Sequence, residues 1–117
     1  MKVLIALSLI AIVLISGCMH TTPTPPAAPA PTTPSPAELA TQGKDLFSAK
    51  GCVGCHRNKD FPTGGTIGPS LDGVSTRLTD DALRTVLKEG RLDKGMPNLG
   101  LTDKEVDALM SYLKTLK

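Results

Sequence analysis

The sequence has few aromatic residues: two Phe, one Tyr and no Trp in 117 residues. Because aromatic side chains bury the largest apolar areas, the chain has little material for a large core of its own. The 13 basic residues barely outnumber the 11 acidic ones, and no basic run is interleaved with aromatics, so nucleic-acid binding has no support. The sequence also has no Ser/His/Asp set, proton-transfer constellation or phosphate-binding loop. We therefore expect that the chain is not an enzyme by itself.

The apolar run from Val3 to Ile15, broken only by Ser8, spans thirteen residues. This length is short for a membrane-spanning helix and typical of a signal peptide. The run ends in Ile15-Ser16-Gly17-Cys18, which resembles the lipobox of bacterial lipoproteins. We expect a lipoprotein signal peptide at residues 1–17 and lipid attachment at Cys18, with an ordinary cleaved signal or an uncleaved anchor as alternatives. Each possibility exports the residues that follow, which predicts an extracytoplasmic domain, and the lipid at Cys18 would anchor this domain at a bacterial membrane.

A proline-rich segment follows the predicted lipid site. Seven of the ten prolines lie between His20 and Pro36, among Thr, Ala and Ser residues. Such a composition cannot bury a core and favours extended polyproline II backbone. We therefore expect residues 18–35 to be the lipid-bearing tether and residues 36–117 to form one small folded domain.

Two of the three cysteines lie in the run Cys52-Val53-Gly54-Cys55-His56. A Cys-x-x-Cys-His run is the attachment signature of c-type haem. Two thiols at this spacing can add to the two vinyl groups of a haem, and the following imidazole can then reach the iron. A thioredoxin-like redox pair, half of a zinc site and a structural disulfide are the alternative interpretations. The first needs a βαβ pattern and the second usually needs four ligands, and the sequence offers neither clearly.

Three helices are predicted and no segment is a strong strand candidate, so the expected fold class is all-α. The predicted helices span residues 36 to about 50, 80–89 and 103–116. Ser35-Pro36-Ala37-Glu38 is a capping box with proline at the first helical position, and Thr102-x-x-Glu105 is a second capping box. Thr79 is the predicted cap of the middle helix. The intervening segments are predicted as loops that wrap around a flat ligand.

The order of these motifs resembles the class I cytochrome c family, whose members are small and carry one haem. The resemblance covers the whole domain and rests on Gly43-x-x-Leu46-Phe47, Gly51-Cys52-x-x-Cys55-His56, Gly68-Pro69-x-Leu71 and Met96-Pro97 before a closing helix. It implies the cytochrome c fold, with three main helices and loops around one covalent haem c and its iron. It also implies that the first and last helices cross near Gly43.

The resemblance assigns a role to each residue of the expected site. Cys52 and Cys55 would form the two thioethers, and His56 would bind the iron through Nε2. The carbonyl of Pro69 would accept a hydrogen bond from the other imidazole nitrogen, which fixes the ring plane. Leu71 would pack on the haem face.

Met96 would be the sixth iron ligand in this family. A thioether is a soft, neutral ligand that raises the potential relative to a second histidine. Met96 lies in a predicted loop and precedes Pro97, whereas Met110 falls on the apolar stripe of the last helix, where a core position is expected. An open sixth position remains the alternative.

The resulting hypothesis is a membrane-tethered carrier of single electrons between extracytoplasmic redox proteins that it meets transiently. One alternative is a haem subunit of a larger oxidase or dehydrogenase complex. The other is a haem protein with an open sixth site, acting as a peroxidase or gas binder.

Overall fold

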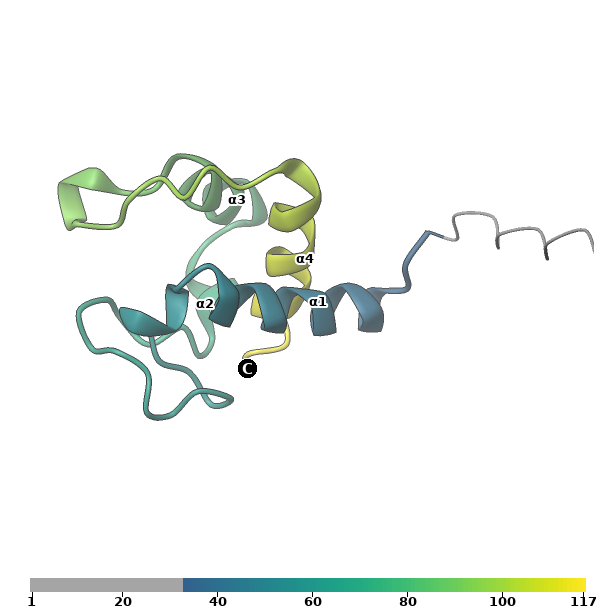
Figure 1. The fold of residues 1–117 in the computed structure, drawn as a ribbon, viewed down its shortest axis with the longest axis horizontal. Coiled ribbons are helices and arrows are strands. Elements are labelled where there is room, and N and C mark those ends of the chain that lie inside the picture. The colour runs from purple at the N-terminus through teal and green to yellow at the C-terminus, as the bar shows by residue number, and fades with distance from the viewer. Residues whose placement is uncertain (1–32) are drawn as a thin grey trace, which may run out of the picture. The chain divides into compact units, whose positions relative to one another are not determined.

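A computed structural model describes residues 33–117 of the chain (Figure 1). The predicted signal peptide, the lipid site Cys18 and the predicted tether up to residue 32 lie outside the described residues. The described part contains α1 (Pro36–Ala49), α2 (Val74–Arg77), α3 (Asp80–Glu89) and α4 (Asp103–Leu113), with two 3₁₀ turns, η1 (Cys52–Gly54) and η2 (Leu92–Lys94). Within residues 33–117 two isolated bridges, Asn58 with Phe61 and Arg91 with Met96, are the only β-type pairings. The all-α prediction is confirmed.

Both predicted capping boxes form. The Ser35 hydroxyl accepts from the backbone N–H of Glu38, and the Glu38 carboxylate accepts from the backbone N–H of Ser35 at 2.7 Å. Thr102 and Glu105 repeat this reciprocal pair at the start of α4. These local contacts satisfy N–H groups that a helix start leaves without partners. The starts of α1, α3 and α4 therefore agree with the sequence-based predictions.

The end of the last helix differs from the prediction, because α4 stops at Leu113 and not at residue 116. Beyond it, Thr115 and Leu116 donate to the carbonyls of Tyr112 and Leu113, which tightens the chain into a short turn. The turn directs Leu116 into the core, where it is fully buried. Leu116 thus joins the core from the turn that follows the helix and not from the helix itself.

The core lies where α1 crosses α4, at Gly43 (Figure 1). A Cβ atom at position 43 would lie 2.0 Å from the carbonyl oxygen of Ala108, so only glycine allows this approach. Phe47 packs beside the crossing, with its ring centroid 5.8 Å from that of Tyr112. The predicted crossing near Gly43 is present. Segments 51–73 and 90–100 extend from it toward one side.

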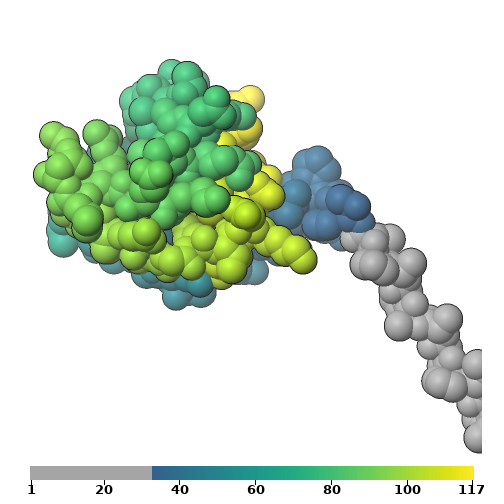
Figure 2. Space-filling model, turned by 90° about the horizontal axis from the view of Figure 1, so that it is seen from above, coloured from purple at the N-terminus to yellow at the C-terminus, as the bar shows by residue number. Residues whose placement is uncertain are grey.

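Ion pairs between exposed side chains connect helix α3 to α4. Lys88 and Arg84 each make an ion pair of 2.7 Å with an aspartate of α4, Asp103 and Asp107 respectively. Exposed pairs of this kind contribute little each, about 0–1 kcal/mol. The apolar side chains of α3 therefore contribute most to its position. Figure 2 shows α3 and the segment after it, in green and yellow-green, forming much of the outer surface on this side.

The contact between the end of α1 and the start of α4 predicts a pH-dependent stability. Lys50 Nζ lies 2.7 Å from a carboxylate oxygen of Glu105. This ion pair, with the hydrogen bonds from Thr102, lowers the pKa of Glu105 from 4.5 to about 2. A depressed carboxyl pKa in the folded state stabilises the protein above pH 4.5, and the contribution is lost as the pH falls toward 2.

We therefore expect Glu105→Gln, which keeps the capping geometry, to lower the free energy of unfolding at neutral pH. The difference from wild type should shrink between pH 4.5 and pH 2. Chemical denaturation of the holoprotein across this range measures it. Asp81→Asn, at an exposed carboxylate without an ion pair among the described residues, is the control. A difference for Glu105→Gln that stays constant across this pH range would contradict the argument.

Candidate functional site

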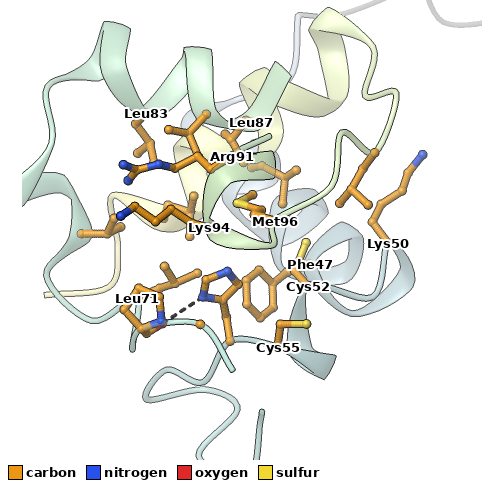
Figure 3. A pocket seen from close by; sticks show the side chains of 18 of the residues that line it. Phe47, Lys50, Cys52, Cys55, Leu71, Leu83, Leu87, Arg91, Lys94 and Met96 are labelled. Carbon is orange, nitrogen blue, oxygen red and sulfur yellow. Dashed lines mark hydrogen bonds between the residues drawn. The ribbon is translucent and has the colours of Figure 1, made fainter. Parts of the chain in front are cut away.

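A cavity of about 550 Å³ lies beside the helix crossing (Figure 3). Its size falls within the roughly 300–1,000 Å³ that is usual for cofactor pockets. Apolar wall residues come from all four described α-helices: Phe47 of α1, Val74 of α2, Leu83, Val86 and Leu87 of α3, and Leu109 and Leu113 of α4. Leu83, Val86 and Leu87 are three or four residues apart or adjacent in α3, so they form one apolar face, and this face is turned toward the cavity. A large apolar ligand would complete the core at this point.

Cys52 and Cys55 line the cavity from the turn η1. The backbone N–H groups of Cys55 and His56 both donate to the carbonyl of Cys52, at 3.1 and 2.9 Å. This tight turn brings both thiols and the imidazole to the same cavity. Both cysteines are free and half-buried, and burial raises the pKa of the Cys52 thiol above its ordinary value.

His56 is oriented by one hydrogen bond. Its Nδ1 lies 2.9 Å from the carbonyl oxygen of Pro69. A carbonyl oxygen can only accept, so Nδ1 carries the proton and Nε2 of the neutral ring keeps its lone pair for a metal. The sequence-predicted residues His56 and Pro69 are thus brought together, and both line the cavity.

Gly68 is a site residue whose role the sequence reasoning missed. A Cβ atom there would lie 2.3 Å from Cε1 of His56, so any side chain would displace the imidazole. The glycine before Pro69 was visible as part of a motif, but its contact with the ring depends on the fold. The loop conformation, with Gly68 N–H donating to the carbonyl of Cys55 at 2.8 Å, produces the contact.

The segment that carries the Pro69 carbonyl is held from several sides. The Arg77 guanidinium donates to the carbonyls of Ser70 and Asp72 at 2.8 and 2.6 Å. The N–H of Leu71 donates to the carbonyl of Arg57 at 3.0 Å. These contacts limit movement of the oxygen that orients His56. Leu71, a predicted site residue, is half-buried and lines the cavity.

Met96 lines the same cavity from the segment between α3 and α4. In Figure 3 it lies across the cavity from Cys55 and Leu71. Its loop is closed by a pair of backbone hydrogen bonds with Arg91, and Gly95 adopts a positive φ of 79°. Met110, by contrast, is buried in the core and does not line the cavity.

A structural disulfide and a zinc site are two of the alternative interpretations of the two cysteines, and the described residues bear on both. Cys52 and Cys55 form no disulfide with each other. Within residues 33–117 no three His, Cys, Asp or Glu side chains gather as a metal-binding group.

The part of the chain that the structure describes contains no helix with the length and apolar character of a membrane span.

The residues around the cavity fit a covalent haem. The apolar walls can contact the two faces of the macrocycle, and the two free thiols can react with its vinyl groups. The oriented imidazole of His56 can provide a nitrogen ligand for the iron. An all-α domain with these groups around one cavity defines a c-type cytochrome domain. Residues 38–113, more than half of the chain, match the family described as cytochrome C oxidase, cbb3-type, subunit III, and the chain belongs to this family. The predicted cytochrome c family, its fold and its haem c cofactor are confirmed.

One curated relative is the Cbb3-type cytochrome c oxidase subunit CcoP of Helicobacter pylori. The two chains are 33% identical over 89 residues, which is 68% of this chain and 29% of the relative. The chain thus matches less than a third of the length of that protein. No solved structure matches the chain.

Proposed function

We propose that this chain transfers single electrons as a haem-bearing subunit of a membrane oxidase complex of the cbb3 type. The observation that carries the proposal is the match of residues 38–113 to subunit III of such oxidases. The similarity to the CcoP subunit supports the same assignment. The domain itself carries no catalytic step, so its contribution to the oxidase reaction is the delivery of electrons.

In this proposal Cys52 and Cys55 would hold the haem covalently, while His56 and Met96 would each supply a ligand to its iron. When bound, the haem iron supplies a reversible one-electron couple. The carbonyl of Pro69 orients His56, and Leu71 would pack on the cofactor together with the apolar walls, which would exclude water. With both residues bound to the iron, no ligand position would stay open for a substrate.

A second candidate is a free carrier that is tethered to the membrane, and the N-terminal sequence favours it. We propose that residues 1–17 are a lipoprotein signal, that Cys18 carries the lipid and that residues 18–35 are the tether of the domain at 36–117. A Pro-rich tether keeps a carrier close to membrane-bound redox proteins and raises its effective concentration there. Both candidates place the haem domain on the extracytoplasmic side of a bacterial membrane.

Solubilisation of native membranes in mild detergent, followed by sizing and haem staining, distinguishes the two candidates. Co-migration with oxidase subunits in fixed stoichiometry is expected for a subunit, and migration alone would refute that assignment. A Cys18→Ser chain separates the contributions to membrane binding. Once its signal segment has been cleaved off, it should stay with the membrane only if protein contacts hold it there. A chain without covalent haem would overturn both candidates.

The sixth ligand has its own test. We expect Met96→Ala to keep the covalent haem but to lose the weak sulfur-to-iron charge-transfer band at the red end of the oxidised spectrum. Its midpoint potential should fall, because the thioether favours ferrous iron. Met110→Leu, which changes a buried core methionine, is the control and should keep both properties. A wild-type protein that lacks the band and binds carbon monoxide rapidly when reduced would instead have an open sixth site.

A further inference from the structure

The charged residues that line the cavity are all cationic. They are Lys50, Arg77, Arg91 and Lys94, with no carboxylate among the lining residues, although the whole chain is nearly balanced in charge. Two of these side chains already have partners within the domain. Lys50 pairs with Glu105, and Arg77 binds backbone carbonyls. Arg91 and Lys94 have no ion pair and no side-chain hydrogen bond within residues 33–117.

The turn η2 aligns these two cations. Arg91 caps η2, and the N–H of Lys94 donates to the carbonyl of Arg91 at 2.9 Å. This hydrogen bond between residues three apart brings the backbones of Arg91 and Lys94 close together. Residues 91–94 are all exposed, but only Arg91 and Lys94 line the cavity, and the intervening Leu92 and Asp93 do not. In Figure 3 the side chains of Arg91 and Lys94 extend in the same direction.

The position of Arg91 and Lys94 suits the propionate carboxylates of a covalent haem. The vinyl groups and the two propionate carboxylates of haem lie on different pyrrole rings. Attachment at Cys52 and Cys55 therefore leaves the carboxylates at the far side of the macrocycle. In Figure 3 the charged ends of Arg91 and Lys94 point away from Cys52 and Cys55. A carboxylate in a partly apolar cavity needs a cation or donors, because its desolvation is otherwise costly.

We propose that Arg91 and Lys94 bind the propionates of the haem and thereby hold the Met96 loop closed over the cofactor. The coupling is direct, because Arg91 N–H donates to the Met96 carbonyl at 2.8 Å and Met96 N–H donates to the Arg91 carbonyl at 3.0 Å. The cations also offset the negative charge of the carboxylates, which favours the reduced iron. This inference rests on the haem site of the proposed function and is independent of which redox partner the domain serves.

The test compares Arg91→Gln, Lys94→Gln and the double variant with Lys104→Gln, which removes an exposed cation of α4 that does not line the cavity. All are purified as holoproteins with their haem content measured. The readouts are the propionate bending bands in resonance Raman spectra and the midpoint potential. We expect each single variant to shift the bands and lower the potential, the double variant to do so most, and Lys104→Gln to change neither. Arg91→Lys should restore most of the potential.

If the bands and the potential of the single variants stay at wild-type values, the inference is overturned. Arg91 and Lys94 would then serve contacts with a partner protein instead of the propionates. The single variants decide the question even if the double variant fails to accumulate. Failure of the proposed function is distinguishable, since it would appear in the wild type as a missing covalent haem or a missing methionine ligand.

Discussion

A chain with His56→Ala is expected to accumulate holoprotein at least about tenfold below wild type, in line with the large losses that removal of a metal ligand or its support causes. In the proposed site His56 would offer Nε2 to the iron, because Nδ1 donates to the Pro69 carbonyl, and no other imidazole lies among the described residues. Without it, haem has the two thiols but no nitrogen ligand to hold it in the cavity. The remaining apolar cavity of about 550 Å³ would then stay unfilled in a domain with a small core.

Haem staining of denaturing gels, normalised to the total exported chain by immunoblot, measures this loss. His20→Ala is the matched control, because His20 is the other histidine of the chain and the sequence places it in the Pro-rich segment. We expect the control to accumulate holoprotein at the wild-type level. Equal haem staining in the two variants would mean that His56 is not a ligand of the haem. The close contacts of Gly68 and Pro69 with its ring would then have no explanation.

The parts of the structure that could be predicted are those with local causes. The starts of α1 and α4 follow from capping boxes whose partners are three residues apart, and the apolar period of α3 is visible in its sequence. The site residues Cys52, Cys55 and His56 share one short run, so their common place in a turn needs no long-range information. Their identity as ligands stays a prediction until the haem-loaded protein is tested.

The parts that could not be predicted depend on contacts between distant segments or on elements too short to have a period. The turns η1 and η2 and the helix α2 contain three or four residues each, which is less than one repeat of any useful pattern. The role of Gly68 depends on where the imidazole lies in space. The alignment of Arg91 with Lys94 likewise depends on the 3₁₀ turn, because from the sequence they belong only to a mildly basic segment.

The choice between a free carrier and an oxidase subunit could not come from the site residues. A haem with two axial ligands serves both, and the ligand run Cys52–His56 is needed equally in each. The tether predicted from the N-terminal sequence favours a separate carrier, whereas the similarity of residues 38–113 to an oxidase subunit favours assembly. The surface outside the cavity, which sequence motifs describe poorly, must carry the contacts that decide between them.

Gly43→Ala is expected to lower the free energy of unfolding of the holoprotein by about 2 kcal/mol, within the ~1–3 kcal/mol that overpacking of a core usually costs. At an exposed helix position the same change would stabilise by about 1 kcal/mol, because alanine is the better helix former. Position 43 reverses the sign, since the new Cβ would lie 2.0 Å from the Ala108 carbonyl oxygen and 2.7 Å from Tyr112 Cβ. The nearest obstacle is backbone, so α1 and α4 must separate to admit the methyl group.

Chemical denaturation of holoprotein measures the change, with Gln42→Ala as the control at the neighbouring exposed position of α1. The control should stay within about 0.5 kcal/mol of wild type. Gly43→Val should cost more than Gly43→Ala, because it adds volume at the same contact. A Gly43→Ala holoprotein as stable as wild type would mean that helix propensity outweighs the crossing. The close approach of α1 and α4 would then not be what holds the wall of the haem cavity in place.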